Sequence, residues 1–392
     1  MILLFLLCII VSIFSQIKPL EDIFRPLMYA SWFFTFLYCI LYAKLKLSLS
    51  KFTYYFIFVL IIFLLYCVFC SSIFGSFHLE NNYLRLLYIP IMLSILGDIY
   101  SNFITEKQLQ IIYITYVLMS IVFAIWVHNT FFSSLLNWRF SMEYVFAQKN
   151  SAAQIWGSAI LINVFLIDYK NALLKHFGKC ISFYLLFLIL ITHCRTALLG
   201  LMVAFFWDFL RYSKHKILLG IVLILLVQII SSVHFIQDTI NHSLLITKYE
   251  GTSLDAFSSG RLGLYSIAWD FFITSPIIGV GAYYVDNSYL LILTESGIIG
   301  FVLIESIWLY KIIECYKSVY YDKFFHKKFS LSSRFLISIL IFYIVESLLE
   351  GFPPFGPGVS SFMFWFITII LIKIDKKNRK VFVSRNKNIC PL

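Results

Sequence analysis

Long, uninterrupted apolar runs are the feature of this sequence that most limits its fold. A helix needs about 20 apolar residues to cross the hydrocarbon layer of a membrane. Because 61% of the 392 residues are hydrophobic and only 13% are charged, the sequence excludes a water-facing globule. It also excludes a transmembrane β-barrel, whose strands would alternate in polarity. The runs lie at residues 1–17, 27–43, 52–74, 84–97, 110–128, 151–167, 180–193, 196–210, 217–237, 287–310, 335–350 and 359–374.

These runs predict an all-α polytopic membrane protein that forms a single integral membrane domain over residues 1–392. One run per span gives about 12 transmembrane helices. The first run lacks the basic segment and the small-residue cleavage site of a secretory signal, so we expect it to be retained as a helix.

The basic residues predict which side of the membrane each loop faces, because cytoplasmic loops collect lysine and arginine. With both termini in the cytoplasm, 23 of the 31 basic residues lie on inner segments and eight on outer ones. The inner segments include a basic cytoplasmic tail at residues 375–392. The net charge of +11 is therefore explained by topology, and no nucleic-acid partner is expected.

The outer basic residues are mostly arginines, five of eight, whereas only four of the 23 inner ones are. A guanidinium matches phosphate oxygens with two parallel hydrogen bonds, which lysine cannot do. Arg195 lies in a tight outer turn between two spans, where a bound anion is the favoured explanation. The alternative for an outer arginine is that it reaches the interface or pairs with a nearby acid.

One connection is long, the outer segment at residues 238–286 between the ninth and tenth spans. Structured loops of this length are usually functional. It contains helix start and stop signals around Arg261, Tyr265 and Trp269, which share one helical face at i, i+4 and i+8. That stripe would hold a phosphate and stack on a sugar ring, or it would form part of an interfacial aromatic belt.

Four further polar residues lie at or near the outer ends of spans. Asp286 is either a carboxylate that takes a proton from a sugar hydroxyl or an ordinary helix N-cap. Asn287 follows it, and Glu295 lies deeper, where the cost of a charge in lipid predicts that it faces the bundle interior. Asn150 opens the sixth span, either as a site residue or as a helix cap.

Glu346 and Glu350 lie on one helix face at the outer end of the eleventh span. They either line an outer cavity or are solvated, and the sequence does not decide between these. The outer histidines lack metal-ligand spacing, and no phosphate-binding loop is present, so neither a metal nor another cofactor is expected.

Several motifs together resemble the O-antigen polymerase and ligase superfamily. SSGRLGLYSIAW, SPIIGVG and VDNSYLLILTESGIIGF are similar to its S-G-R…W, P…G-x-G and [HD]-N-x-Y-L…E-x-G-I-x-G patterns. HCRTALLGL and QKNSAA resemble its S-R-T-A-L-L and N-x-x-A segments. The resemblance covers roughly residues 150–300, and the motifs occur in the family's order on one side of the membrane.

The resemblance implies a glycosyltransferase of GT-C-like architecture in the bacterial inner membrane, with its active site at the periplasmic face. Its substrate would be an undecaprenyl-diphosphate-linked oligosaccharide, used without a metal or a nucleotide sugar. Arg195 and Arg261 match the two outer arginines thought to hold the lipid diphosphate. Tyr265 and Trp269 would line the sugar path. Asn287, Glu295 and Asn150 match motif positions and would also bind substrate.

One departure from the family favours polymerase over ligase. Ligases, which transfer glycan to lipid A core, carry histidine before the asparagine of the span-ten motif, and this chain has Asp286 there. The sequence therefore predicts an O-antigen polymerase, with Asp286 as catalytic base or acceptor orienter. Whether a polysaccharide chain-length regulator is a further partner is left open by the sequence. The alternatives are a ligase and, from another class, a flippase for lipid-linked oligosaccharides.

Overall fold

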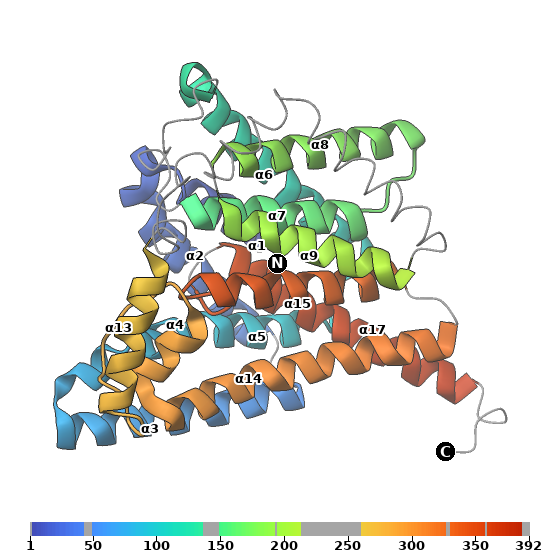
Figure 1. Ribbon diagram of the computed structural model, residues 1–392. Coiled ribbons are helices and arrows are strands. Elements are labelled where there is room, and N and C mark those ends of the chain that lie inside the picture. Colours follow the sequence, from blue (N-terminus) through green and yellow to red (C-terminus); the bar gives the residue numbers. More distant parts are fainter. Residues whose placement is uncertain are drawn as a thin grey trace.

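The computed structural model describes residues 2–42, 49–135, 149–192, 194–212, 260–326, 330–356 and 359–385, and their regular secondary structure is helical. Figure 1 shows the longer helices packed side by side. The helices are α1 (Ile2–Phe14), α2 (Glu21–Tyr42), α3 (Lys51–Phe74), α4 (Asn82–Leu86), α5 (Tyr88–Tyr100), α6 (Glu106–Leu135), α7 (Lys149–Phe165), α8 (Ala172–Ile191), α9 (Arg195–Tyr212), α13 (Arg261–Thr274), α14 (Ser288–His326), α15 (Leu331–Leu349), α16 (Val359–Phe362) and α17 (Thr368–Arg385).

Within the described residues, seven helical segments are long and apolar enough to cross a membrane, and α1 is a shorter apolar helix. The structure is thus consistent with a polytopic membrane protein. The count of twelve spans stays a prediction, and the predicted run at 217–237 lies outside the described residues. The seven segments are Lys18–Tyr42, Lys51–Phe74, Asn82–Tyr100, Glu106–Thr130, Ala172–Ile191, Ser288–Tyr320 and Leu331–Leu349.

The predicted outer loop at 238–286 is described only from residue 260 onward, where α13 forms its main element. The predicted tail at 375–392 continues α17 as far as Arg385, and its last residues lie outside the described part.

The core of the bundle is aromatic. α17 is reached from α16 through a buried π-helical turn, Met363–Ile367. In that turn, Phe366 stacks on Phe5 of α1, with ring centroids 4.8 Å apart, and Trp365 packs against Phe52 and Phe56 of α3. Such ring pairs add stabilisation beyond the area they bury. The π-helical turn thereby packs against both the first and the third helix.

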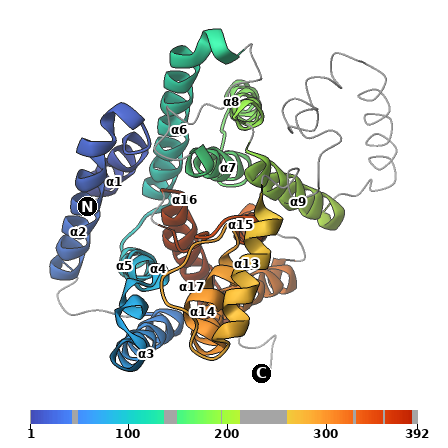
Figure 2. The same ribbon diagram turned by 60° about the vertical axis from the view of Figure 1, so that its left-hand side comes forward.

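Ion pairs fasten one end of the bundle. Arg334, near the start of α15, binds Asp208, near the end of α9, with Nε 2.8 Å from Oδ1 and Nη2 2.5 Å from Oδ2. Asp98 of α5 is fully buried and lies 3.1 Å from Nζ of Lys373 on α17. Both basic residues belong to segments that the sequence assigns to the cytoplasmic side. The far ends of α9 and α15 therefore meet at the opposite side, where the predicted site lies (Figure 2).

α14 is interrupted at Gly297, where the backbone has φ 60° and ψ −168°. The segment at 276–281, which follows α13, fills this break and hydrogen-bonds to it. The amide of Ile298 donates to the carbonyl of Pro276 over 2.9 Å, and the amide of Gly281 donates to the carbonyl of Glu295 over 3.1 Å. The glycines of the P…G-x-G and E-x-G motifs thus allow two backbones to meet, which ties α13 to α14.

Candidate functional site at the outer ends of α7, α9, α13, α14 and α15

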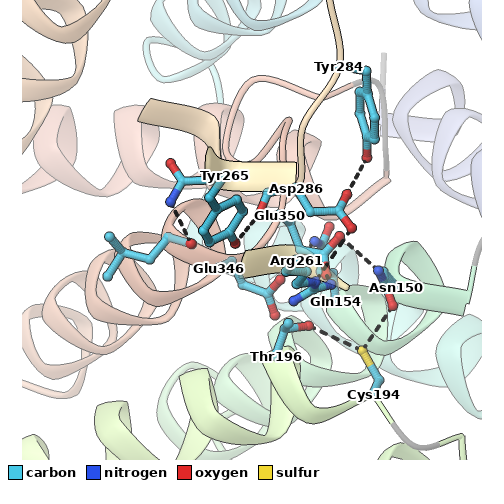
Figure 3. Close-up of polar contacts among 12 residues, drawn as sticks. Asn150, Gln154, Cys194, Thr196, Arg261, Tyr265, Tyr284, Asp286, Glu346 and Glu350 are labelled. Atoms are coloured by element: carbon cyan, nitrogen blue, oxygen red, sulfur yellow. Dashed lines mark hydrogen bonds and ion pairs between the residues drawn. The ribbon is translucent and has the colours of Figure 1, made fainter. Parts of the chain in front are cut away.

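Arg261 is the centre of a polar cluster and is the first residue of α13. Its Nη2 lies 2.8 Å from Oε1 of Glu350, and its Nε lies 3.5 Å from Oδ2 of Asp286 (Figure 3). Glu350 directly follows α15, and Asp286 lies just before α14. The structure therefore brings together two residues predicted for the site, Arg261 and Asp286, and adds Glu350 to them.

Two tyrosines hold Asp286. The hydroxyl of Tyr265, one turn after Arg261 on α13, donates to the backbone carbonyl of Asp286 over 2.6 Å. The hydroxyl of Tyr284 donates to Oδ1 of the same residue over 2.7 Å. Burial raises the pKa of both phenols, so at neutral pH they stay protonated and act as donors. The Asp286 carboxylate is thereby fixed opposite the guanidinium of Arg261.

Asn150, at the start of α7, joins the cluster from the other side. Its Nδ2 donates to Oε2 of Glu350 over 2.8 Å. Its Oδ1 lies 3.4 Å from Sγ of Cys194, the residue before Arg195. Arg195 is half-buried at the first position of α9, so its backbone starts next to the cluster. All four motif regions that carry Asn150, Arg195, Arg261 and Asp286 thus converge.

Glu346 lies one turn before Glu350 on α15 and is fully buried. Its Oε2 accepts a hydrogen bond from Nε2 of Gln154 over 3.0 Å, and its Oε1 has no hydrogen-bond partner among the described residues. The sequence left open whether these two glutamates are solvated, and the structure answers that both are enclosed. The sequence did contain a signal for this enclosure: two glutamates four residues apart in an apolar helix. Carboxylates within such a helix usually face the interior of the bundle, where they find polar partners.

The pKa values of Glu350 and Arg261 depend both on burial and on the neighbouring charges of the cluster. Burial raises the pKa of Glu350, the guanidinium of Arg261 pulls it down, and the carboxylate of Asp286 raises it again. Burial alone would lower the pKa of Arg261, but Glu350 and Asp286 outweigh that and raise it. An anionic ligand that binds Arg261 would therefore compete with two resident carboxylates.

Residues 180–304 match a family model described as O-antigen ligase. The match contains Arg195, Arg261 and Asp286, together with the break in α14. The match supports membership of the O-antigen polymerase and ligase superfamily. The superfamily consists of glycosyltransferase-like membrane enzymes that use lipid-linked glycans. A comparison with curated proteins finds no significant match to this chain.

Two further motif residues, Asn287 and Glu295, have contacts that hold helices of the bundle together. Asn287 caps α14, since its Oδ1 accepts from the amide of Leu290 over 2.9 Å. Its Nδ2 donates to the carbonyl of Leu348 over 2.9 Å, which joins the start of α14 to the end of α15. Glu295 is fully buried and accepts from Nδ2 of Asn82 over 2.6 Å, so it braces the α14 break.

Trp269 lies further along α13 than Arg261 and Tyr265. Its side chain is 49% exposed, and its ring packs against Phe272 with centroids 5.2 Å apart. Of the three residues in the predicted stripe, Arg261 and Tyr265 contact the cluster, whereas Trp269 contributes an exposed aromatic surface beyond it.

Proposed function

We propose that this superfamily member is an O-antigen polymerase that joins undecaprenyl-diphosphate-linked repeat units at the periplasmic face of the bacterial inner membrane. The observation that carries the proposal is the guanidinium of Arg261, held between the carboxylates of Glu350 and Asp286 beside the start of α9. Such a site offers both a cation for a diphosphate and an anion for a hydroxyl proton. These are the two groups that glycosyl transfer from a lipid diphosphate needs.

In the proposed reaction, a hydroxyl of the acceptor repeat unit attacks the anomeric carbon of the donor glycan. The bond from that carbon to the diphosphate breaks, and its electron pair leaves on the phosphate oxygen. Arg261 and Arg195 stabilise the charge that develops there, which preorganised donors do best where water is scarce. The hydroxyl proton passes to a carboxylate of the cluster, and Asp286 orients the acceptor.

The other residues that the sequence predicted to bind substrate have roles around this reaction. Tyr265 and Trp269 line the sugar path on α13, with Tyr265 also holding Asp286. Asn150 positions Glu350. We assign Asn287 and Glu295 to the frame, because their side chains already hold helix ends and the α14 break.

Polymerase is favoured over ligase by Asp286, which occupies the position where ligases carry histidine. A flippase should have two similar halves around a central polar cavity. The Arg261 cluster instead lies at one end of the bundle, which is the arrangement expected of an enzyme acting at one membrane face.

Lipopolysaccharide from a strain lacking only this gene tests the proposal. A polymerase mutant should carry a core with a single repeat unit, and the wild-type gene should restore the ladder. Arg195→Ala and Arg261→Ala should not restore it at normal protein levels. A bare core would remove the polymerase assignment, and accumulation of polymer on the lipid carrier would then identify a ligase.

A further inference from the structure

We propose that Glu350 is the base that takes the acceptor's proton, and that Arg261 keeps this carboxylate occupied until the donor diphosphate binds. This inference rests on the proposed function and names a catalytic residue for it. Glu350 lies outside the segment matched by the family model, residues 180–304, and was left undecided by the sequence. The case rests on its contacts, its burial and its position between two parts of the site.

The two oxygens of the Glu350 carboxylate have separate partners, so Glu350 can lose Arg261 and still be held in place. Oε1 is 2.8 Å from Nη2 of Arg261, and Oε2 accepts from Nδ2 of Asn150 over 2.8 Å. When a diphosphate takes over the guanidinium, Oε1 loses its partner while Asn150 still holds Oε2. One oxygen then faces the reacting groups with its lone pairs free, and the carboxylate does not move.

Glu350 is more buried than Asp286, so transfer of the Arg261 guanidinium to a diphosphate should affect the carboxylate of Glu350 more strongly. The side chain of Glu350 is 8% exposed, against 28% for Asp286, and it lies closer to Arg261. Coulomb interactions weaken as solvent access increases. Withdrawal of the cation therefore raises the basicity of Glu350 more, toward the range in which a general base is most effective.

Glu350 also lies between the two arginines along the chain of contacts. Arg261 binds one oxygen of its carboxylate, and Asn150 connects the other oxygen to Cys194, next to Arg195. A diphosphate that reached both arginines would pass this carboxylate. The titratable and polar groups near Glu350 are Arg261 and Tyr265 on α13, Tyr284 and Asp286 before α14, Asn150 on α7, Cys194 before α9 and, one turn away on α15, Glu346.

The proposed step balances within the site. The acceptor oxygen forms the new glycosidic bond as its proton moves to Oε1 of Glu350. The bond from the anomeric carbon to the diphosphate breaks, and undecaprenyl diphosphate leaves on Arg261. Loss of this product returns Arg261 to Glu350, which releases its proton to water and resets the site.

The test uses the full-length protein in proteoliposomes, with lipid-linked repeat units extracted from the deletion strain as donor and acceptor. Glu350→Gln should lower the rate of polymer formation by about 100-fold or more, the usual range for general base catalysis. Its affinity for undecaprenyl diphosphate should equal or exceed that of the wild type, because a competitor for Arg261 is gone. Asp286→Asn should retain more activity, and Glu314→Gln, far from the cluster, should match the wild type.

A pH series separates catalysis from folding. Glu350 must be ionised to act, so the wild-type rate should fall on acidification, and this limb should vanish from the residual rate of Glu350→Gln. If Glu350→Gln does not fold, Glu350→Asp tests the same role. If residue 350 is the base, the acidic limb of the pH–rate profile should have a different midpoint in Glu350→Asp than in the wild type.

Three results would overturn the role of Glu350: near wild-type turnover in Glu350→Gln, loss of undecaprenyl diphosphate binding in that variant, or an unchanged acid limb in Glu350→Asp. None of these touches the proposed function as long as the wild type makes polymer. Failure of the wild type to polymerise the extracted donor would instead remove the proposed function itself.

Discussion

A Cβ atom on Gly297 would lie 2.3 Å from both the carbonyl carbon and the carbonyl oxygen of Ile277. The two backbones thus meet where no side chain fits between them. Gly297 also has φ 60°, a conformation that side chains disfavour. Since Ile277 follows α13 directly, this contact fixes the helix that carries Arg261 against the broken helix that follows Asp286.

Gly297→Ala should therefore destabilise the protein strongly, because it adds a clash with backbone to the cost of a strained φ. We expect a fall of several degrees in the thermal midpoint in detergent, together with loss of polymer. Gly75→Ala is the matched control, because Gly75 also has a positive φ but no atom lies within 4 Å of its added Cβ. That variant should lose only the strain, about 1–3 kcal/mol, and equal midpoints for the two would contradict the contact.

Arg261→Lys should lose most polymer formation although it keeps the charge. A single ammonium cannot contact Glu350 and Asp286 as the guanidinium fork does, nor can it bind a diphosphate with two parallel hydrogen bonds. We expect about a 10-fold to 100-fold loss on lipopolysaccharide gels, consistent with about 1.4–2.8 kcal/mol of transition-state stabilisation. Arg25→Lys is the control, because Arg25 is half-exposed and pairs with Glu21 one turn away on the same helix. Full activity in Arg261→Lys would argue against a bidentate anion.

Asn287→Ala should cost about 1 kcal/mol of stability, the usual value of a helix N-cap, and somewhat more through the lost bond to Leu348. Asn287→Asp keeps an acceptor for the amide of Leu290 and should recover the capping part. Thermal unfolding of both variants in detergent measures the difference. If Asn287→Asp were as unstable as Asn287→Ala, the cap would not be the stabilising contact.

Asp208→Asn should weaken the packing of α9 on α15, because it removes the carboxylate charge beside the partly buried Arg334 and leaves a single acceptor oxygen for its guanidinium. We expect a loss of about 1–3 kcal/mol, since removing one partner of an enclosed pair costs more than removing an exposed pair. The double variant Asp208→Asn/Arg334→Gln should recover part of this loss, which a double-mutant cycle measures. Lys376→Gln, which breaks a more exposed pair with Glu314, serves as control. Strict additivity would show that the two residues are not coupled.

Cys194 should resist a membrane-impermeant thiol reagent at neutral pH. Burial raises its pKa to about 12, and only the thiolate reacts at a useful rate. Two single-cysteine proteins make the comparison, one that keeps only Cys194 and one that carries only Thr274→Cys. Thr274→Cys, at the exposed end of α13, should react readily in whole cells if that end faces the periplasm. Labelling of Cys194 at the same rate would show that the site is open, and protection of Thr274→Cys would reverse the proposed sidedness.

The sequence predicted the helical elements well, because an apolar run of about 20 residues is itself a strong signal. It also predicted α13, from the glycine before it and the proline after it. The break in α14 was not predicted, since Gly297 lies within an apolar run and its partner segment lies about twenty residues earlier. Backbone contacts of this kind depend on tertiary placement, which periodicity does not record.

Arg261 and Asp286 were predicted for the site from their type, outer position and motif, and the structure places their side chains 3.5 Å apart. Glu350 was left open, because a carboxylate at a helix end can either line a cavity or be solvated. Its contacts with α13 and α7 depend on tertiary packing, which the sequence does not record. The roles expected for Asn287 and Glu295 illustrate the converse. A residue at a family motif position can support the backbone instead of facing the substrate.

The ladder of backbone bonds between segment 276–281 and α14 also affects how the enzyme would work through successive turnovers. Arg261 is mounted on a helix that is held at its far end, so it can exchange one anion for another by turning its side chain alone. Such an exchange needs no collective movement of helices, which takes microseconds or longer. We therefore expect departure of the spent carrier lipid, not opening of the protein, to set the pace of chain growth.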